Sequence, residues 1–390
     1  ERAVSSVRAD SIRSRLFPAD YSMLAQCIPE SDLVFETVAE DFETKRDVYR
    51  KIAPHLRPGT VIASGTSGLS ITAFAEILPE AARPAYVGMH FFNPPYQLVL
   101  CELIPTRYTE PALLVKLKEY LEKTLLRAVA EVSDSPAFLG NRIGFLFMND
   151  ALIYAEKYRC SGGIDYIDAI LGSFTGRGMA PLVTIDFVGL DIHKAIIDNV
   201  RKNIQEGLSS YFELPGFFTD LLEQGHLGRK THSGLYRTQI IEDGKKQRLV
   251  YDVSSGAYRE KRKYTFAFAE QMQLLIHEGD YQGAVRELIQ NDSQEARLCL
   301  AFLLRYIAYA LYASMQVSGS LQAADVVMAE GFNWCPPLAM LGLFSQVVDV
   351  SALMNERLDA AFLDVTDVQR LLSGAPVSQY DYRRFFRSAI

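Results

Sequence analysis

The chain contains 390 residues, of which 49% are hydrophobic and 22% charged, a composition typical of a globular protein with two or three domains. Its formal net charge of −7 argues against the basic surface that binding to nucleic acid requires. The five cysteines lack the spacing of metal ligands, so no metal site is expected, and they suit a reducing cytoplasm, where we expect the protein to be located: Cys27, Cys101, Cys160, Cys299 and Cys335.

Short apolar runs alternate with helical patterns through the first third of the chain. Asp41 and Ser70 are expected to cap two of the helices. This alternation predicts a mostly parallel sheet that helices cover on both faces. We expect strands at 32–38, 60–63, 85–92, 98–104 and 128–132, and helices at 41–52, 70–78 and 110–126.

A histidine and a carboxylate interrupt the two central apolar strands. His90 lies just before Asn93-Pro94-Pro95, which ends its strand because proline cannot donate to a sheet ladder. Glu102 is the single acid in the following apolar run. A carboxylate partner would orient the imidazole and stabilise its cationic form, which makes a general base. A satisfied core histidine and an edge glutamate fit this pair equally well.

Several polar residues fall at the ends of the expected strands or in the loops that follow. In a parallel sheet, ligands bind beyond the carboxyl ends of the strands, so these residues predict a single site. They are Glu36, Glu40, Ser67, His90 and Glu102.

A glycine-rich turn of the GxGxxG type, which a dinucleotide-binding fold needs between its first strand and helix, is missing from the sequence. Residues 172–178 are rich in glycine but follow a helical pattern. We expect the first βαβ unit of such a fold to be missing here, and a natural loss of dinucleotide binding is the alternative.

The rest of the chain is mainly helical. Helices are expected at 141–157, 164–171, 179–187 and 192–204, turns at 243–246 and 254–256 between short strands, and helices again from 265. The apolar stretch Cys299–Met315 contains Arg305 and predicts a buried helix, not a membrane span. A partial repeat links Asp168 with Pro181 and Asp325 with Pro337 at nearly equal spacing (181 − 168 = 13; 337 − 325 = 12).

Five motifs in order resemble the L-3-hydroxyacyl-CoA dehydrogenase family, in its longer type with a duplicated C-terminal helical domain. The resemblance covers about residues 32–237, with a weaker echo near the C-terminus. The motifs are His90-Phe91-Phe92-Asn93-Pro94 with Glu102, Glu36–Asp41 with Lys45, Ser64–Ser67, Asp134-Ser135-Pro136 with Asn141-Arg142, and Asp186–Asp191.

The resemblance implies an α/β fold: a Rossmann-like parallel-sheet domain without its first βαβ unit, followed by two all-α domains like those of 6-phosphogluconate dehydrogenase. The expected boundaries are 1–133 for the NAD-binding domain, 134–237 for the first helical copy, 238–264 for a connector and 265–390 for a second, degenerate copy. The two helical copies should pair as an internal pseudo-dimer across an apolar interface.

The resemblance also implies roles for individual residues. His90 would be the catalytic base, Glu102 its partner, and Ser67 and Asn141 the groups that hold the substrate oxygen near it. Glu40, Lys45, Ser67 and Asn93 would contact the NAD cofactor. Simpler roles remain open: turn chemistry for Ser67, a helix cap for Asn141, and an exposed ion pair for Glu40 and Lys45.

The implied activity is NAD-dependent oxidation of L-3-hydroxyacyl-CoA to 3-oxoacyl-CoA in fatty acid β-oxidation. An acyl-CoA substrate and a fused or associated enoyl-CoA hydratase are the expected partners. Gly65 and Gly68 replace the usual Asn and Ser of the family, which puts the substrate range in doubt. A dehydrogenase of a small hydroxy acid and a non-catalytic scaffold are the alternatives.

Because residues 1–390 contain no glycine-rich turn to hold a pyrophosphate, we expect this chain by itself to bind NAD weakly or not at all. Titration calorimetry with the 390-residue chain measures this. A dissociation constant in the micromolar range would contradict the expectation.

Overall fold

The computed structural model describes residues 13–203, 207–240 and 246–386, and the chain divides into two compact units, Glu1–Phe138 and Leu139–Ile390. Each unit has its own core and is described by itself. The expected turn at 243–246 lies largely outside the described residues.

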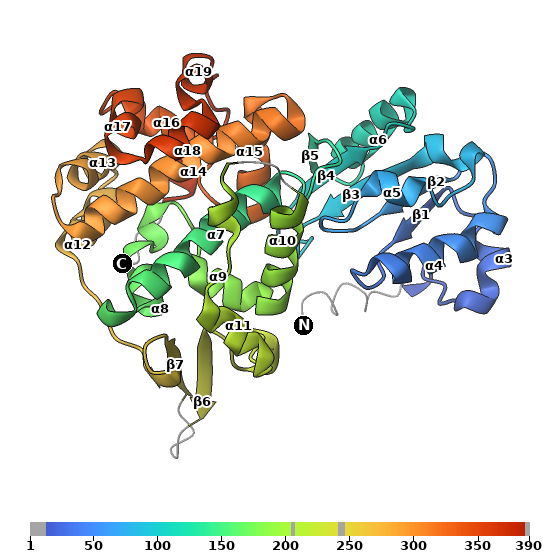
Figure 1. Cartoon of the computed structure of the whole chain (residues 1–390). Helices are drawn as coiled ribbons and strands as arrows, with labels where there is room; N and C mark the ends of the chain where they lie inside the picture. Colours follow the sequence, from blue (N-terminus) through green and yellow to red (C-terminus); the bar gives the residue numbers. More distant parts are fainter. Residues whose placement is uncertain (1–12, 204–206, 241–245, 387–390) are drawn as a thin grey trace. The chain divides into compact units, whose positions relative to one another are not determined.

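The first unit is built on a five-stranded sheet in the order β1-β2-β3-β4-β5 (Figure 1). The β1–β2, β2–β3 and β4–β5 pairs are parallel, whereas β3 and β4 are antiparallel. The strands are β1 (Leu33–Glu36), β2 (Val61–Ser64), β3 (Tyr86–Phe91), β4 (Leu100–Pro105) and β5 (Ala128–Glu131). The expected set of strands is therefore confirmed, with bounds that differ by at most two residues.

The single antiparallel pair has a simple cause in the sequence. Only residues 92–99 separate β3 from β4, too few for the crossover helix that a parallel neighbour requires. The chain turns back at Asn93-Pro94-Pro95 and pairs with the strand that it has just left. His90 and Glu102 are consequently direct partners in the register of the two strands.

Helices α4 (Phe42–Ile52), α5 (Ile71–Ala75) and α6 (Pro111–Lys123) accompany this sheet. Asp41 and Ser70 accept hydrogen bonds from the backbone N–H groups of Thr44 and Ala73, so both predicted caps are confirmed. Helix α5 ends before the expected Leu78, because a residue that precedes proline, here Pro79, avoids the helical conformation. The core beneath α6 is apolar and fully buried: Ala63, Val87, Met89, Cys101, Leu103, Leu117 and Leu121.

The second unit begins with the long helix α7 (Gly140–Lys157), most of whose residues are buried. This first helical segment continues with α8, α9 and α10, which agree with the predicted helices, and with α11, where no helix is predicted. Their bounds are Ile164–Ile170, Pro181–Val188, Leu190–Asn203 and Gly216–Glu223.

A three-stranded antiparallel sheet follows: β6 (Tyr236–Ile240), β7 (Lys246–Asp252) and β8 (Ala257–Glu260). The predicted turn at 254–256 joins β7 to β8. Arg259 attaches the sheet to α8, because its guanidinium lies 2.7 and 2.8 Å from the two carboxylate oxygens of Asp165. The described residues of the connector therefore contain a sheet that is attached to the first helical segment.

The second helical segment is organised around α14 (Gln294–Ser318). This helix is long and apolar enough to cross a membrane, but 83% of its most apolar stretch is buried inside the unit, so the predicted buried helix is confirmed. The remaining helices are α12 (Ala267–His277), α13 (Tyr281–Gln290), α15 (Leu321–Val327), α16 (Pro337–Ser345), α17 (Val350–Arg357), α18 (Ala360–Thr366) and α19 (Val368–Ser373).

The two helical segments pack on each other, as the orange α14 beside the green α7 shows (Figure 1). Arg177 forms an antiparallel bridge with Trp334, and the N–H of Cys335 donates to the carbonyl of Gly176 at 2.7 Å. The guanidinium of Arg177 is fully buried, with the rings of Phe147, Tyr306 and Trp334 at 3.8, 4.8 and 4.7 Å. Both segments thus enclose one buried cation.

Asp168 and Asp325, the aspartates of the partial repeat, both accept hydrogen bonds from backbone N–H groups at the start of a helix. Asp168 accepts the backbone N–H groups of Leu182 and Val183 at the start of α9. Asp325 accepts the N–H of Leu338 at 2.7 Å at the start of α16, and the hydroxyl of Ser378 also donates to it. Burial raises the pKa of each carboxyl to about 6. The division into two copies of one domain stays a prediction.

The raised pKa of Asp325 gives a test of this packing. The folded chain holds the proton more tightly than the unfolded chain, whose Asp has its ordinary pKa of 3.8. Ionisation therefore costs the folded state about 3 kcal/mol above pH 6, and this cost disappears as the pH falls toward 3.8. Asp325→Asn keeps an acceptor for Leu338 and removes the charge.

We expect Asp325→Asn to be more stable than the wild type above pH 6 and to lose that advantage as the pH falls toward 4. Urea unfolding of both proteins between pH 4 and 8 measures the difference, in which all other titrating groups cancel. A difference that does not change with pH would contradict the assignment.

Candidate active site

The centre of the site is a buried pair on the two antiparallel strands. His90 on β3 is 4% exposed and Glu102 on β4 is completely buried. The Nδ1 atom of His90 lies 2.7 Å from Oε2 of Glu102. The expectation that these two residues lie within hydrogen-bond reach is confirmed. Because an ionised carboxylate can only accept, Nδ1 carries the proton and Nε2 is left as the basic nitrogen.

Aromatic side chains surround this imidazole. The rings of Phe92 and Phe138 lie 4.5 and 5.5 Å from the His90 ring. Ala137 and Phe138 both have positive φ angles, 61° and 50°, which are costly for residues with a side chain. The chain adopts this backbone directly after Asp134-Ser135-Pro136, and the result is a ring held against His90.

Glu36, at the end of β1, is the acceptor on which the neighbouring loops converge. Its carboxylate is buried and accepts hydrogen bonds from Lys45 Nζ at 2.9 Å, Tyr49 Oη at 3.0 Å and Ser64 Oγ at 2.8 Å. The N–H of Val38 donates to it at 2.7 Å. One carboxylate therefore joins β1, α4 and β2 at the carboxyl ends of the two strands, the end of a parallel sheet at which ligands generally bind.

Glu40 extends this cluster into the loop after β2. Its Oε2 lies 3.3 Å from the Nζ of Lys45, which is only 1% exposed, while the Glu40 side chain is 43% exposed. Its Oε1 accepts the N–H of Ser67 at 2.8 Å and the hydroxyl of Thr66 at 2.5 Å. Lys45 is thus a buried part of the site and not a member of an exposed ion pair.

The structure places the remaining predicted residues in different surroundings. Asn93 is exposed in the turn after β3, and Ser67 is partly buried beside Glu40. Asn141 belongs to the second unit, where it is buried in the first turn of α7; Leu139, and not Asn141, occupies the cap position. Of the predicted catalytic set, the first unit therefore contains His90, Glu102 and Ser67.

Comparison with known proteins agrees with this arrangement. Residues 4–135 match the model of the NAD binding domain of 3-hydroxyacyl-CoA dehydrogenase, and residues 138–238 match the model of its C-terminal domain. A 3-hydroxybutyryl-CoA dehydrogenase of Bradyrhizobium diazoefficiens is 35% identical over 213 residues, which are 55% of this chain and 69% of that protein. The chain belongs to the 3-hydroxyacyl-CoA dehydrogenase family.

Longer relatives cover more of the chain. A probable 3-hydroxyacyl-CoA dehydrogenase of Bacillus subtilis is 27% identical over 326 residues, 82% of this chain and 40% of that protein. The chain thus spans about two-fifths of the length of this relative. The crystal structure of 3-hydroxybutyryl-CoA dehydrogenase from Escherichia coli has the same fold, with a TM-score of 0.66 and 19% identity over 95% of this chain and 88% of that chain.

Within this family fold, the sequence did not reveal everything that surrounds the site. Tyr49 is buried on α4, and its hydroxyl donates to Glu36 and accepts from the hydroxyl of Tyr86 at 2.9 Å. The side chain of Asp134 accepts the N–H groups of Ile71 and Thr72 at the start of α5. These contacts join residues far apart in the sequence, so only the position of Asp134 after a strand could have suggested such a role.

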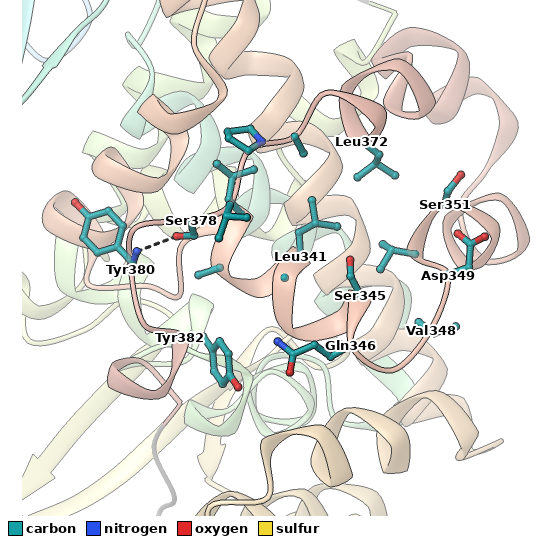
Figure 2. A pocket seen from close by; sticks show the side chains of 17 residues that line it. Leu341, Ser345, Gln346, Val348, Asp349, Ser351, Leu372, Ser378, Tyr380 and Tyr382 are labelled. Carbon is teal, nitrogen blue, oxygen red and sulfur yellow. Dashed lines mark hydrogen bonds between the residues drawn. The ribbon is translucent and has the colours of Figure 1, made fainter.

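A separate cavity of about 570 Å³ lies in the second helical segment (Figure 2). Its described lining includes Ser345, Gln346 and Asp349 together with apolar residues, and no Lys, Arg or His. It therefore offers no cation to the phosphates of coenzyme A or a dinucleotide.

Substitution of either glutamate near Lys45 by glutamine should lower the stability of the protein, but by different amounts. Glu36→Gln leaves a lysine that is 1% exposed without its closest carboxylate, and we expect it to lower the free energy of unfolding by about 3–5 kcal/mol. Glu40→Gln changes a side chain that is 43% exposed, and we expect a cost of about 1 kcal/mol or less. Urea unfolding at neutral pH measures both, and equal losses would contradict the central position of Glu36.

Proposed function

We propose that the chain carries the catalytic base of an NAD-dependent dehydrogenase that oxidises L-3-hydroxyacyl-CoA to 3-oxoacyl-CoA. The observation that carries the proposal is the 2.7 Å contact between His90 Nδ1 and Glu102, both buried and placed opposite each other by the register of β3 and β4. Membership of the 3-hydroxyacyl-CoA dehydrogenase family supports the reaction type.

His90 removes the proton of the 3-hydroxyl group through Nε2. Glu102 holds the ring through Nδ1 and stabilises the imidazolium that forms. The surrounding Phe92 and Phe138 keep water away from the imidazole, which strengthens its interaction with the carboxylate. The hydroxyl oxygen becomes the 3-oxo group as its proton goes to His90 and the hydride of C3 leaves. NAD, when bound, accepts this hydride.

The polar groups beyond β1 and β2 fit the nicotinamide half of this cofactor. A carboxamide needs an acceptor for its NH₂ group and a donor for its oxygen. The partly exposed carboxylate of Glu40 would be the acceptor and the hydroxyl of Ser67 the donor. The buried ammonium of Lys45 holds Glu40 in place through their ion pair. Asn93, exposed after β3, is a further candidate contact. These residues would hold the nicotinamide side of NAD.

We further propose a place in fatty acid β-oxidation and a cytoplasmic location. Association or fusion with an enoyl-CoA hydratase is part of the same proposal, because a hydratase supplies the 3-hydroxyacyl-CoA that this site consumes. We propose that residues other than His90 and Glu102 select the length of the acyl chain. One of them is Gly65, which has no side chain and so leaves little bulk in the loop beside Glu40.

Substitution of the base tests the proposal. His90→Ala should lower kcat for oxidation of 3-hydroxybutyryl-CoA by about 10²–10⁴, the contribution of a positioned general base, with a smaller change in KM. Glu102→Gln should lower kcat less, since His90 keeps its position in the strand. The appearance of NADH at 340 nm measures both.

Free 3-hydroxybutyrate is the matched control substrate, because it has the same reacting carbon without coenzyme A. A protein that oxidises the free acid as well as the thioester would instead be a dehydrogenase of small hydroxy acids. Full activity of His90→Ala would remove His90 from the mechanism, and complete absence of turnover in the wild type would favour a scaffold.

A further inference from the structure

Helices α7 and α14 lie against each other in opposite directions. The Nε of Arg142, near the start of α7, donates to the hydroxyl of Tyr309 at 3.2 Å, and Tyr154, near the end of α7, packs on Phe302 at 5.1 Å. Between these contacts, Phe147 lies 5.5 Å from the ring of Phe302. The crossing point of the two helices is therefore close to Phe147 and Phe302.

The same two helices match in sequence when they are offset by 155 positions (302 − 147 = 155). Arg142, Phe147, Tyr154 and Ala155 then coincide with Arg297, Phe302, Tyr309 and Ala310. Because Phe147 contacts its own counterpart at the crossing point, the helices are arranged like two copies related by a local twofold axis. In such an arrangement equivalent positions near the axis face each other.

One position near the crossing point carries opposite charges in the two helices. Asp150 coincides with Arg305, one turn after the phenylalanines, and the two side chains form a buried ion pair. The Nε of Arg305 donates to Oδ2 of Asp150 at 2.9 Å, and Nη2 lies 2.6 Å from the same oxygen. Asp150 and Arg305 are only 3% and 6% exposed. The charge of this position is thus opposite in the two helices.

We propose that the Asp150–Arg305 pair makes the packing face of α7 selective for α14 of the same chain and excludes pairing of either helix with a second copy of itself. Two α7 helices packed in this way would bury two facing aspartates, and two α14 helices would bury two facing arginines. Either arrangement leaves like charges in contact without water, whereas the pairing within one chain brings opposite charges together.

The burial of this ion pair points to selectivity rather than stability as its role. Burial raises the pKa of Asp150 above its ordinary value, even though Arg305 acts to lower it. Burial acts to lower the pKa of Arg305, but its neighbours, Asp150 foremost, outweigh burial and the pKa of Arg305 is raised. The two shifts oppose each other and show no clear net gain in stability from the pair. Buried ion pairs of this kind are often replaced by apolar residues without loss of stability, and setting partner or register is their best-attested use.

Charge exchange in the complete 390-residue chain tests the proposal. Asp150→Arg and Arg305→Asp each place like charges together and should lower the unfolding midpoint by about 10 °C. The double variant with both exchanges restores opposite charges and should regain most of that loss. The double variant Asp150→Leu/Arg305→Met removes both charges at similar volume and serves as the neutral control.

The neutral control, Asp150→Leu/Arg305→Met, shows whether the ion pair determines which helices pair or only how stable the fold is. We expect it to keep the wild-type midpoint within a few degrees but, after refolding from urea at rising protein concentration, to form an additional species of twice the mass. The wild type and the charge-exchanged variant should keep one mass by light scattering. Refolding concentrations should extend toward the millimolar range, where a second chain competes with the segment on the same chain.

Two results would overturn the proposal. If the charge-exchanged double variant loses as much as the two single variants together, the helices do not recognise complementary charge. If the neutral control refolds to the wild-type mass at every concentration, the connection between the segments alone selects the partner. The second readout uses only the neutral double variant and the wild type, so it still decides the proposal if a single variant fails to fold.

Discussion

The completely buried carboxylate of Glu102 is the constraint on which the site in the first unit depends. A charge in an apolar strand is tolerated only beside a partner, and the antiparallel register of β3 and β4 supplies His90 directly opposite. That register exists because the chain turns back within eight residues, 92–99. A parallel β4 would need a crossover helix, and Glu102 would then enter the sheet far along the chain from His90. The contact between His90 and Glu102 is thus a consequence of the short turn between β3 and β4.

The same principle governs the other buried charges of the chain. Glu36 has four donors and joins three elements, while Lys45 is held between Glu36 and Glu40. Arg177 is different, because it has no carboxylate partner among the described residues: aromatic faces surround it, and only its Nη1 donates, to the carbonyl and hydroxyl oxygens of Thr175. Burial lowers its pKa to about 10, so it stays charged at neutral pH, stabilised by the ring faces.

The sequence predicts those parts of the fold that local chemistry decides. The alternation of apolar runs gives all five strands of the first sheet, and Asp41 and Ser70 are visible as helix caps. His90 and Glu102 are predictable because a titratable residue in an apolar strand is unusual. The convergence on Glu36 and the Arg177 cage could not be predicted, because their members come from separate elements that only tertiary packing brings together.

The contacts that stabilise each unit differ in how far apart their residues lie in the sequence. The site pair of the first unit joins residues twelve positions apart, whereas Arg142–Tyr309 and Asp150–Arg305 in the second unit join residues more than 150 apart. Contacts of large sequence separation cost loop-closure entropy, which grows with the length of the intervening chain. The intervening helices and the sheet β6–β8, fastened to α8 through Arg259, reduce that cost by ordering the connection in advance. Until α14 packs on it, the packing face of α7 is exposed to other partners. A charged position at the centre of that face then has its greatest effect on which partner can bind.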